Sequence, residues 1–293
     1  MNALIKIIWK NPLSIKLRIW KRRFFPSSKD PSAGLSKLNV LKAFPAYIPC
    51  SGGSYAARSP LTINAINGVF PSICRFLQSV GVDSVTPGRI EDFARGEVDA
   101  LAVDSLGRLF DQHGSDKANE CRSYHPFYAA ALKSPETVKC IVEVGLGTNN
   151  TDVVSNMGSG GKPGASLRAF RAFCPNARII GADIDRRILF NEERIETHYI
   201  DQTCKDAIET FGRVVPDDVD LFIDDGLHSP HANINTMTLG LSKIRIGGWM
   251  VVEDIGSAAL PIWAVVAALL PSRFSARLLN RGSAYLFVVK RLE

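Results

Sequence analysis

Short apolar segments alternate with amphipathic segments throughout the second half of the chain. Five apolar segments have the length and composition of buried strands, and they lie at residues 138–145, 177–185, 197–201, 219–225 and 247–254. Helical periodicity separates them, most clearly at residues 166–173 and 233–242. Strands that alternate with helices form parallel sheets with helices on both faces, so the pattern predicts a doubly wound α/β fold.

The two ends of the chain depart from this alternation. Residues 261–270 have the composition of a buried helix, and residues 275–281 and 283–291 predict two strands around a Gly-Ser turn. Residues 61–112 have mainly helical patterns. We therefore expect a Rossmann-like, mostly parallel sheet of seven strands that ends in an antiparallel hairpin, with a helical extension on its N-terminal side.

The positive charge of the chain is concentrated at its N-terminus. The net charge is +6, and residues 1–30 hold eight Lys and Arg against one acid (8 − 1 = +7), which leaves 6 − 7 = −1 for the rest. Four apolar side chains share one face of a predicted helix there, namely Leu13, Leu17, Trp20 and Phe24. This pattern in residues 1–25 favours a helix on an anionic membrane surface, although docking on a protein surface is also consistent with it.

These observations predict three parts and a location. Residues 1–30 would be a basic amphipathic tail, residues 31–104 a linker with a helical region, and residues 105–293 the main domain. The six cysteines form no CxxC pair, and no apolar run approaches the about 18 residues that cross a bilayer. We therefore expect a cytoplasmic protein, peripheral on the inner face of the membrane if the tail binds lipid. Basic residues that alternate with bulky apolar ones argue against nucleic-acid binding.

Polar residues or glycine follow each of the five predicted strands. They are Glu143 and Gly145, Asp183 and Asp185, Asp201, Asp224 and Asp225, and Glu253 and Asp254. Ligands of parallel α/β sheets bind beyond the carboxyl ends of the strands, so these residues predict a binding site at that edge.

The order of the strand ends suggests a nucleoside-containing ligand. EVGLG at 143–147 allows a tight turn that gives a ligand access to the backbone, but GLGTNN lacks the third glycine of a dinucleotide fingerprint. Asp183 could accept both hydroxyls of a ribose, and Asp201-Gln202 could contact an adenine edge. A helix cap at Asp183 and a simple turn at Asp201 are the structural alternatives.

The succession EVGLG, GADID, DQT, DDGLH and GGWMVVED, followed by a hairpin, resembles the class I S-adenosylmethionine-dependent methyltransferases. With LFDQHGSDKANECRSYHPFY, DIDRRI and VVEDI, it resembles more narrowly the metal-dependent sugar O-methyltransferases of macrolide biosynthesis and the cephalosporin-hydroxylase-like group of polysaccharide gene clusters. The resemblance covers roughly residues 105–293.

The resemblance implies roles for individual residues. The cofactor S-adenosylmethionine would be held by Glu143, Gly145, Gly147, Asp183, Asp201, Gln202 and Asp224. Tyr124 could close over the cofactor or substrate, with buried packing as the alternative. A divalent metal would be bound by Asp225, Glu253 and Asp254, whose hard oxygens suit Mg²⁺ or a similar cation. His228 would be the catalytic base.

Two departures from the family pattern concern the entrance to the site. The insertion TNNTDVVSNMGSGGKPGAS replaces the usual third glycine, and Leu227 stands where the family often has a small residue. The expected function is O-methylation of a sugar hydroxyl, in a cell-surface or lipid-linked glycan. A non-catalytic scaffold subunit of a glycan-biosynthesis complex and a nucleotide-dependent oxidoreductase are the alternatives. The acceptor sugar and a homo-oligomeric state stay open.

Overall fold

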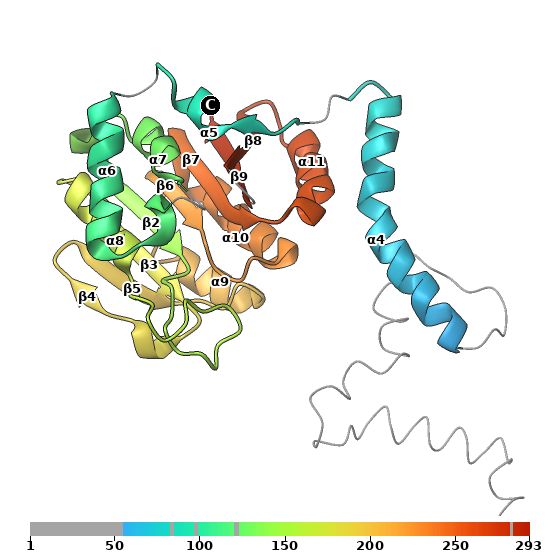
Figure 1. Cartoon of the computed structure of the whole chain (residues 1–293), viewed down its shortest axis with the longest axis horizontal. Coiled ribbons are helices and arrows are strands. Elements are labelled where there is room, and N and C mark those ends of the chain that lie inside the picture. The colour runs from blue at the N-terminus through green and yellow to red at the C-terminus, as the bar shows by residue number, and fades with distance from the viewer. Residues whose placement is uncertain (1–54, 83–84, 97–98, 120–122, 282–283) are drawn as a thin grey trace, which may run out of the picture. The chain divides into compact units, whose positions relative to one another are not determined.

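The computed structural model describes residues 55–82, 85–96, 99–119, 123–281 and 284–293 (Figure 1). The chain divides into two units, residues 1–72 and 73–293. The first contributes only part of helix α4 (Tyr55–Ser79) to the described residues, so the predicted basic tail lies outside them. Among the residues described, no helix is both long and apolar enough to span a bilayer.

One mixed sheet forms the centre of the second unit. Its strands are β1 (Gly88–Arg89), β2 (Cys140–Val144), β3 (Arg178–Asp183), β4 (Asn191–Glu192), β5 (Ile195–Tyr199), β6 (Val219–Asp224), β7 (Ile244–Ile255), β8 (Phe274–Arg281) and β9 (Ala284–Arg291). They lie in the order β1-β8-β9-β7-β6-β2-β3-β5-β4. The seven predicted strands are all present. The two further strands, β1 and β4, have two residues each at the sheet edges, too short to leave a hydrophobic pattern.

The pairing of the strands follows the predicted topology. β7, β6, β2, β3 and β5 are parallel neighbours. β9 runs antiparallel to both β7 and β8, which confirms the closing hairpin. The doubly wound α/β prediction is therefore correct.

Two helical layers cover the two faces of the sheet (Figure 1). One layer has α5 (Ile90–Ala94), α6 (Ala100–His113), α7 (His125–Ala131) and α8 (Ala165–Phe173), and the other has α9 (Lys205–Gly212), α10 (Pro230–Lys243) and α11 (Leu260–Leu269). Alternate residues of a strand face opposite layers, so Ile141 joins the core beneath α6–α8 while Val142 joins the core beneath α9–α11. Every residue of β2 is buried, as expected of a central parallel strand.

The structure describes four of the six cysteines. Cys74, Cys140, Cys174 and Cys204 are all free. Burial raises the pKa of the Cys140 and Cys174 thiols to about 12, so neither forms the reactive thiolate at neutral pH.

Candidate active site

A cavity of about 560 Å³ lies at the carboxyl ends of the central parallel strands. Eight of the predicted site residues line it, namely Gly145, Gly147, Asp183, Asp201, Gln202, Asp225, His228 and Asp254. Four others, Tyr124, Glu143, Asp224 and Glu253, do not line it. Eight of the twelve predicted residues thus line one cavity, and the other four are not part of its lining.

The first glycine after β2 permits a very close approach of two backbone segments. Gly145 has a φ of 98°, and a Cβ atom there would lie 2.1 Å from the carbonyl oxygen of Asp225. The same approach allows the Asp225 N–H to donate to the Val144 carbonyl at 2.8 Å. A side chain at position 145 would therefore separate the turn after β2 from the end of β6.

Asp183 holds the glycine-containing turn against the end of β3. Its Oδ2 accepts the Leu146 N–H at 2.7 Å, and its Oδ1 accepts the Asp185 N–H at 2.8 Å. Burial raises the pKa of Asp183. The carboxylate also lines the cavity, which is a suitable position for a contact with a ribose. That contact stays a prediction.

The insertion after Gly147 forms one wall of the cavity. Asp185 Oδ2 accepts hydrogen bonds from Thr148 Oγ1 at 2.7 Å and Asn150 Nδ2 at 2.8 Å. Further along, Ser155 Oγ donates to the Gly226 carbonyl at 2.9 Å. These bonds tie the insertion to β3 and to the end of β6, and Val153, Val154 and Met157 then line the cavity.

Gln202 and Asp224 form a polar network beneath the cavity. Gln202 Nε2 donates to Asp224 Oδ1 at 2.8 Å and to Thr236 Oγ1 at 2.7 Å, while its Oε1 accepts the Leu227 N–H at 2.8 Å. Both N–H groups of the amide are therefore engaged inside the protein. Asp224 is fully buried and also accepts from Asn233 Nδ2 at 3.1 Å. Asp224 therefore takes part in this network and does not line the cavity, and its contact with the cofactor stays a prediction.

Three potential metal ligands converge at the cavity. Ligand atoms of Asp225, His228 and Asp254 lie within 4.8 Å of one another. His228 Nε2 is 4.0 Å from Asp225 Oδ1 and 4.0 Å from Asp254 Oδ2. His228 and Asp254 both have a φ of 55°, and the register between β7 and β9 shifts between Val252 and Ile255. Such left-handed conformations are costly for residues with a Cβ and concentrate at functional sites.

Glu253 contacts different groups from its neighbour Asp254. It is fully buried, and its Oε1 accepts hydrogen bonds from Lys117 Nζ at 2.8 Å and from the Tyr128 hydroxyl. Its Oε2 has no hydrogen-bond partner among the described residues. The side chains whose potential ligand atoms converge are those of Asp225, His228 and Asp254, and the role of Glu253 as a metal ligand stays a prediction.

Lys117 is the main site-associated residue that the sequence did not reveal. It lies in a short 3₁₀ turn (Asp116–Ala118), is 1% exposed, and its Nζ contacts three carboxylates: Asp225 at 2.6 Å, Glu253 at 2.8 Å and Glu143 at 3.2 Å. We call these four residues the lysine–carboxylate cluster. Burial alone would lower the pKa of Lys117, but the three carboxylates outweigh it and raise this pKa well above its ordinary value.

Glu143 and Tyr124 hold side chains of the cluster and its surroundings in place, and their contacts with the cofactor stay predictions. Glu143 accepts a hydrogen bond from Ser166 Oγ at 2.6 Å and is buried beside Lys117. The Tyr124 hydroxyl donates to Asp254 Oδ1 at 2.7 Å. Both residues therefore stabilise the side chains around the cavity, and the structure brings neither to its surface.

No family model matches the chain, but curated sugar O-methyltransferases are similar to part of it. A 3′-O-methyltransferase of 8-demethyl-8-(2-methoxy-α-L-rhamnosyl)-tetracenomycin C from Streptomyces olivaceus is 31% identical over 61% of this chain and 45% of its own length. Mycinamicin VI 2″-O-methyltransferase from Micromonospora griseorubida is 34% identical over 33% of this chain and 24% of its own.

A solved structure shows the same fold. The MycE methyltransferase, in complex with Mg, SAH and mycinamycin VI, superimposes with a TM-score of 0.52 at 20% identity, over 64% of this chain and 55% of MycE. This chain has the class I methyltransferase fold. The resemblance to sugar O-methyltransferases seen in the sequence is confirmed. The chain spans less than half the length of the curated relatives that it matches.

Proposed function

We propose that the protein is an S-adenosylmethionine-dependent O-methyltransferase that acts on a sugar hydroxyl with the help of a divalent cation. One observation carries this proposal: a single cavity contains both the glycine turn with Asp183 and the group Asp225, His228 and Asp254. Relatives of the chain are sugar O-methyltransferases by name, and MycE was solved with Mg and SAH. One part of the cavity would thus bind the cofactor and the other the cation, and both would serve the same methyl transfer.

The cofactor would occupy the half of the cavity next to β2 and β3. Gly145 and Gly147 have positive φ values of 98° and 74°, so the turn exposes backbone where side chains would otherwise project. Asp183 and Asp201 line the same region and offer carboxylate oxygens to hydroxyl groups. Val153, Val154 and Met157 of the insertion also line the cavity and offer apolar contacts to a ligand.

The other half has the charge and the ligand types for a divalent cation. Lys117 contacts three carboxylates, those of Glu143, Asp225 and Glu253, and the charge of Asp254 also acts on Glu253. The described acids of this group thus outnumber the single lysine. Burial and the neighbouring charges of Asp225 and Asp254 raise the pKa of Glu253. A bound cation would reduce this repulsion, and oxygen ligands from Asp225 and Asp254 suit Mg²⁺.

The residues then have separate parts in methyl transfer. S-adenosylmethionine supplies an electrophilic methyl group on a sulfonium sulfur. Asp225 and Asp254 would hold the cation against the acceptor, and His228 would accept the proton of the sugar hydroxyl as its oxygen bonds to the methyl carbon and the carbon–sulfur bond breaks. Tyr124 and Lys117 would keep the two aspartates in place through the hydrogen bonds described above.

Cofactor binding gives the direct test of the proposal. We expect isothermal titration to show saturable binding of S-adenosylmethionine, and Asp183→Asn to weaken it about 10- to 100-fold, since hydrogen bonds to a charged group contribute about 1.5–3 kcal/mol each. Asp206→Asn, an exposed acid on α9, is the matched control and should bind as wild type does. No binding to the wild-type protein would refute the methyltransferase assignment. Binding without methyl transfer to any sugar would favour the scaffold alternative.

We propose further that the acceptor is a cell-surface or lipid-linked glycan presented at the membrane. The support is the sequence of residues 1–25, where Lys and Arg flank a stripe of Leu, Trp and Phe. Each basic residue near an anionic surface contributes about 1 kcal/mol, so deletion of residues 1–25 should abolish co-sedimentation with phosphatidylserine vesicles. Equal sedimentation of the full-length and shortened proteins would contradict this part of the proposal alone.

A further inference from the structure

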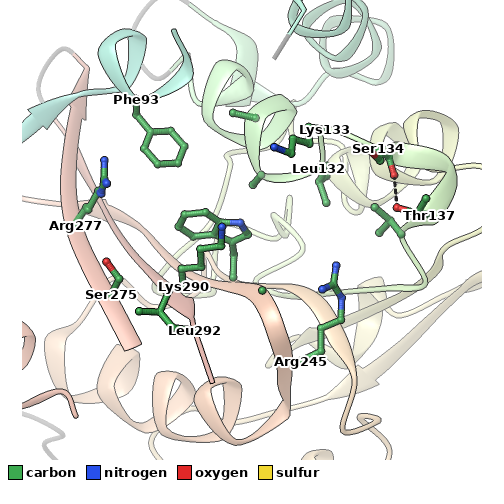
Figure 2. A pocket seen from close by; sticks show the side chains of 15 residues that line it. Phe93, Leu132, Lys133, Ser134, Thr137, Arg245, Ser275, Arg277, Lys290 and Leu292 are labelled. Carbon is green, nitrogen blue, oxygen red and sulfur yellow. Dashed lines mark hydrogen bonds between the residues drawn. The ribbon is translucent and has the colours of Figure 1, made fainter. Parts of the chain in front are cut away.

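A second concavity, of about 440 Å³, lies on the sheet face between the end of α7 and strands β7, β8 and β9 (Figure 2). It shares no lining residue with the first cavity. Its position along β7 is also different, because Arg245 and Gly247 near the start of the strand line this pocket whereas Asp254 near its end lines the other. The methyl-transfer proposal therefore gives this pocket no role.

The pocket is lined by cations. Lys133, Arg245, Arg277 and Lys290 all contribute to it, and within the described part of the chain no aspartate or glutamate does. Arg245 is compensated, since its Nε lies 2.6 Å from Asp220 Oδ1. Among the residues that the structure describes, Arg277 and Lys290 contact aromatic rings and no carboxylate: Arg277 Cζ is 5.6 Å from the centroid of Phe93, and Lys290 Nζ is 5.2 Å from that of Trp249. Their charges are available to an anion.

The floor of the pocket is aromatic. Trp249 is half-buried, and its ring packs edge-on against Phe93 and Phe127 with centroids 5.6 Å apart in each case. Figure 2 shows Phe93 and Arg277 at the left of the pocket, Lys290 near its centre and Lys133 at the upper right. A flat apolar surface thus lies next to two cations, which is an arrangement suited to a ligand with a ring and an acidic group.

We propose that this pocket binds a phosphorylated small molecule, with its phosphate between Arg277 and Lys290 and its ring against Trp249. A phosphate monoester carries a charge of about −1.5 to −2 at neutral pH, which matches two cations better than a single carboxylate does. The volume lies within the about 300–1,000 Å³ typical of small-molecule sites. The chain's own residues 1–30 are excluded as occupants by their charge of +7 (8 − 1).

Uridine 5′-monophosphate is the probe of choice, because it lacks the adenine that the first cavity is proposed to accept. We expect isothermal titration of the full chain to show saturable binding that persists in saturating S-adenosylmethionine. Uridine and inorganic phosphate should each bind at least about tenfold more weakly. Absence of binding, or competition by S-adenosylmethionine, would overturn the proposal. Equal affinity for inorganic phosphate would overturn the role of Trp249.

Substitution of the two cations tests whether the nucleotide binds in this pocket. The double variant Arg277→Gln with Lys290→Gln should weaken binding by about tenfold or more, since it removes both charged donors. The matched control is Lys205→Gln with Arg213→Gln, which removes the same charge from exposed positions outside the pocket. Thermal unfolding of both variants shows whether they fold. An equal loss in the two double variants would mean that net charge alone attracts the nucleotide, contrary to a built site.

Discussion

Replacement of Lys117 by methionine should lower the free energy of unfolding by about 3–5 kcal/mol, the usual cost of removing one partner from a buried ion pair. Methionine has a similar length, so the change creates little cavity and mainly removes the charge. Glu253 is fully buried and would keep only its hydrogen bond from the Tyr128 hydroxyl. Glu143 would keep only its hydrogen bond from Ser166 Oγ. Chemical denaturation monitored by circular dichroism measures the loss.

A second substitution separates the charge from the packing. In the variant Lys117→Met with Glu253→Gln, one buried carboxylate is also neutralised, so the two changes should be less destabilising together than their sum, by about 0.5–3 kcal/mol. Lys205→Met is the control, because Lys205 forms an exposed pair with Glu209 at 3.4 Å and should cost at most about 0.5 kcal/mol. A loss of less than about 1 kcal/mol in Lys117→Met would show that the cluster is not a buried ionic network.

The same lysine shows why part of the site could not be read from the sequence. A lysine between an aspartate and an alanine in a short turn has the pattern of an exposed residue, since lysine is almost never fully buried without partners. Its partners are far apart along the chain, 136 residues away for Glu253 and 108 for Asp225. The motif around it supported the resemblance, but only the packing of the 3₁₀ turn against β6 and β7 reveals the contacts.

The strands were easier to predict because their pattern is local. A central parallel strand is buried on both faces, so it leaves a nearly continuous apolar run such as CIVEV in β2, where Glu143 is the one polar residue. The position of the cavity follows equally directly, because the carboxyl ends of parallel strands meet at one edge. The two-residue strands β1 and β4 leave no such run.

The direction of individual side chains at that edge was the difficult part. Asp224 and Asp225 are consecutive, yet one is buried against Gln202 and the other lines the cavity. Glu253 and Asp254 divide in the same way, and there the left-handed φ of Asp254 sets the direction. A sequence pattern of two acids indicates a strand end, but the turn and the register shift decide which acid reaches the ligand.

His228 should be the residue whose loss most reduces the rate of methyl transfer. We expect His228→Asn to lower kcat by about 10²- to 10⁴-fold, the range for removal of a general base. Asparagine tolerates the left-handed φ of 55° at this position, so the backbone should stay in place while the proton acceptor is lost. The affinity for S-adenosylmethionine should change little, because His228 is proposed to act on the acceptor.

The neighbouring histidine provides the matched control. His231 lies three residues further on, is exposed, and contacts Ser229 Oγ through its Nδ1 at 3.2 Å without lining the cavity. His231→Asn should therefore keep at least about half of the wild-type kcat, because exposed substitutions away from a site have small effects. Equal losses in both variants would indicate that the loop after β6 matters as a unit. A kcat unchanged in His228→Asn would leave deprotonation of the acceptor to the cation held by Asp225 and Asp254, since no other imidazole among the described residues lines the cavity.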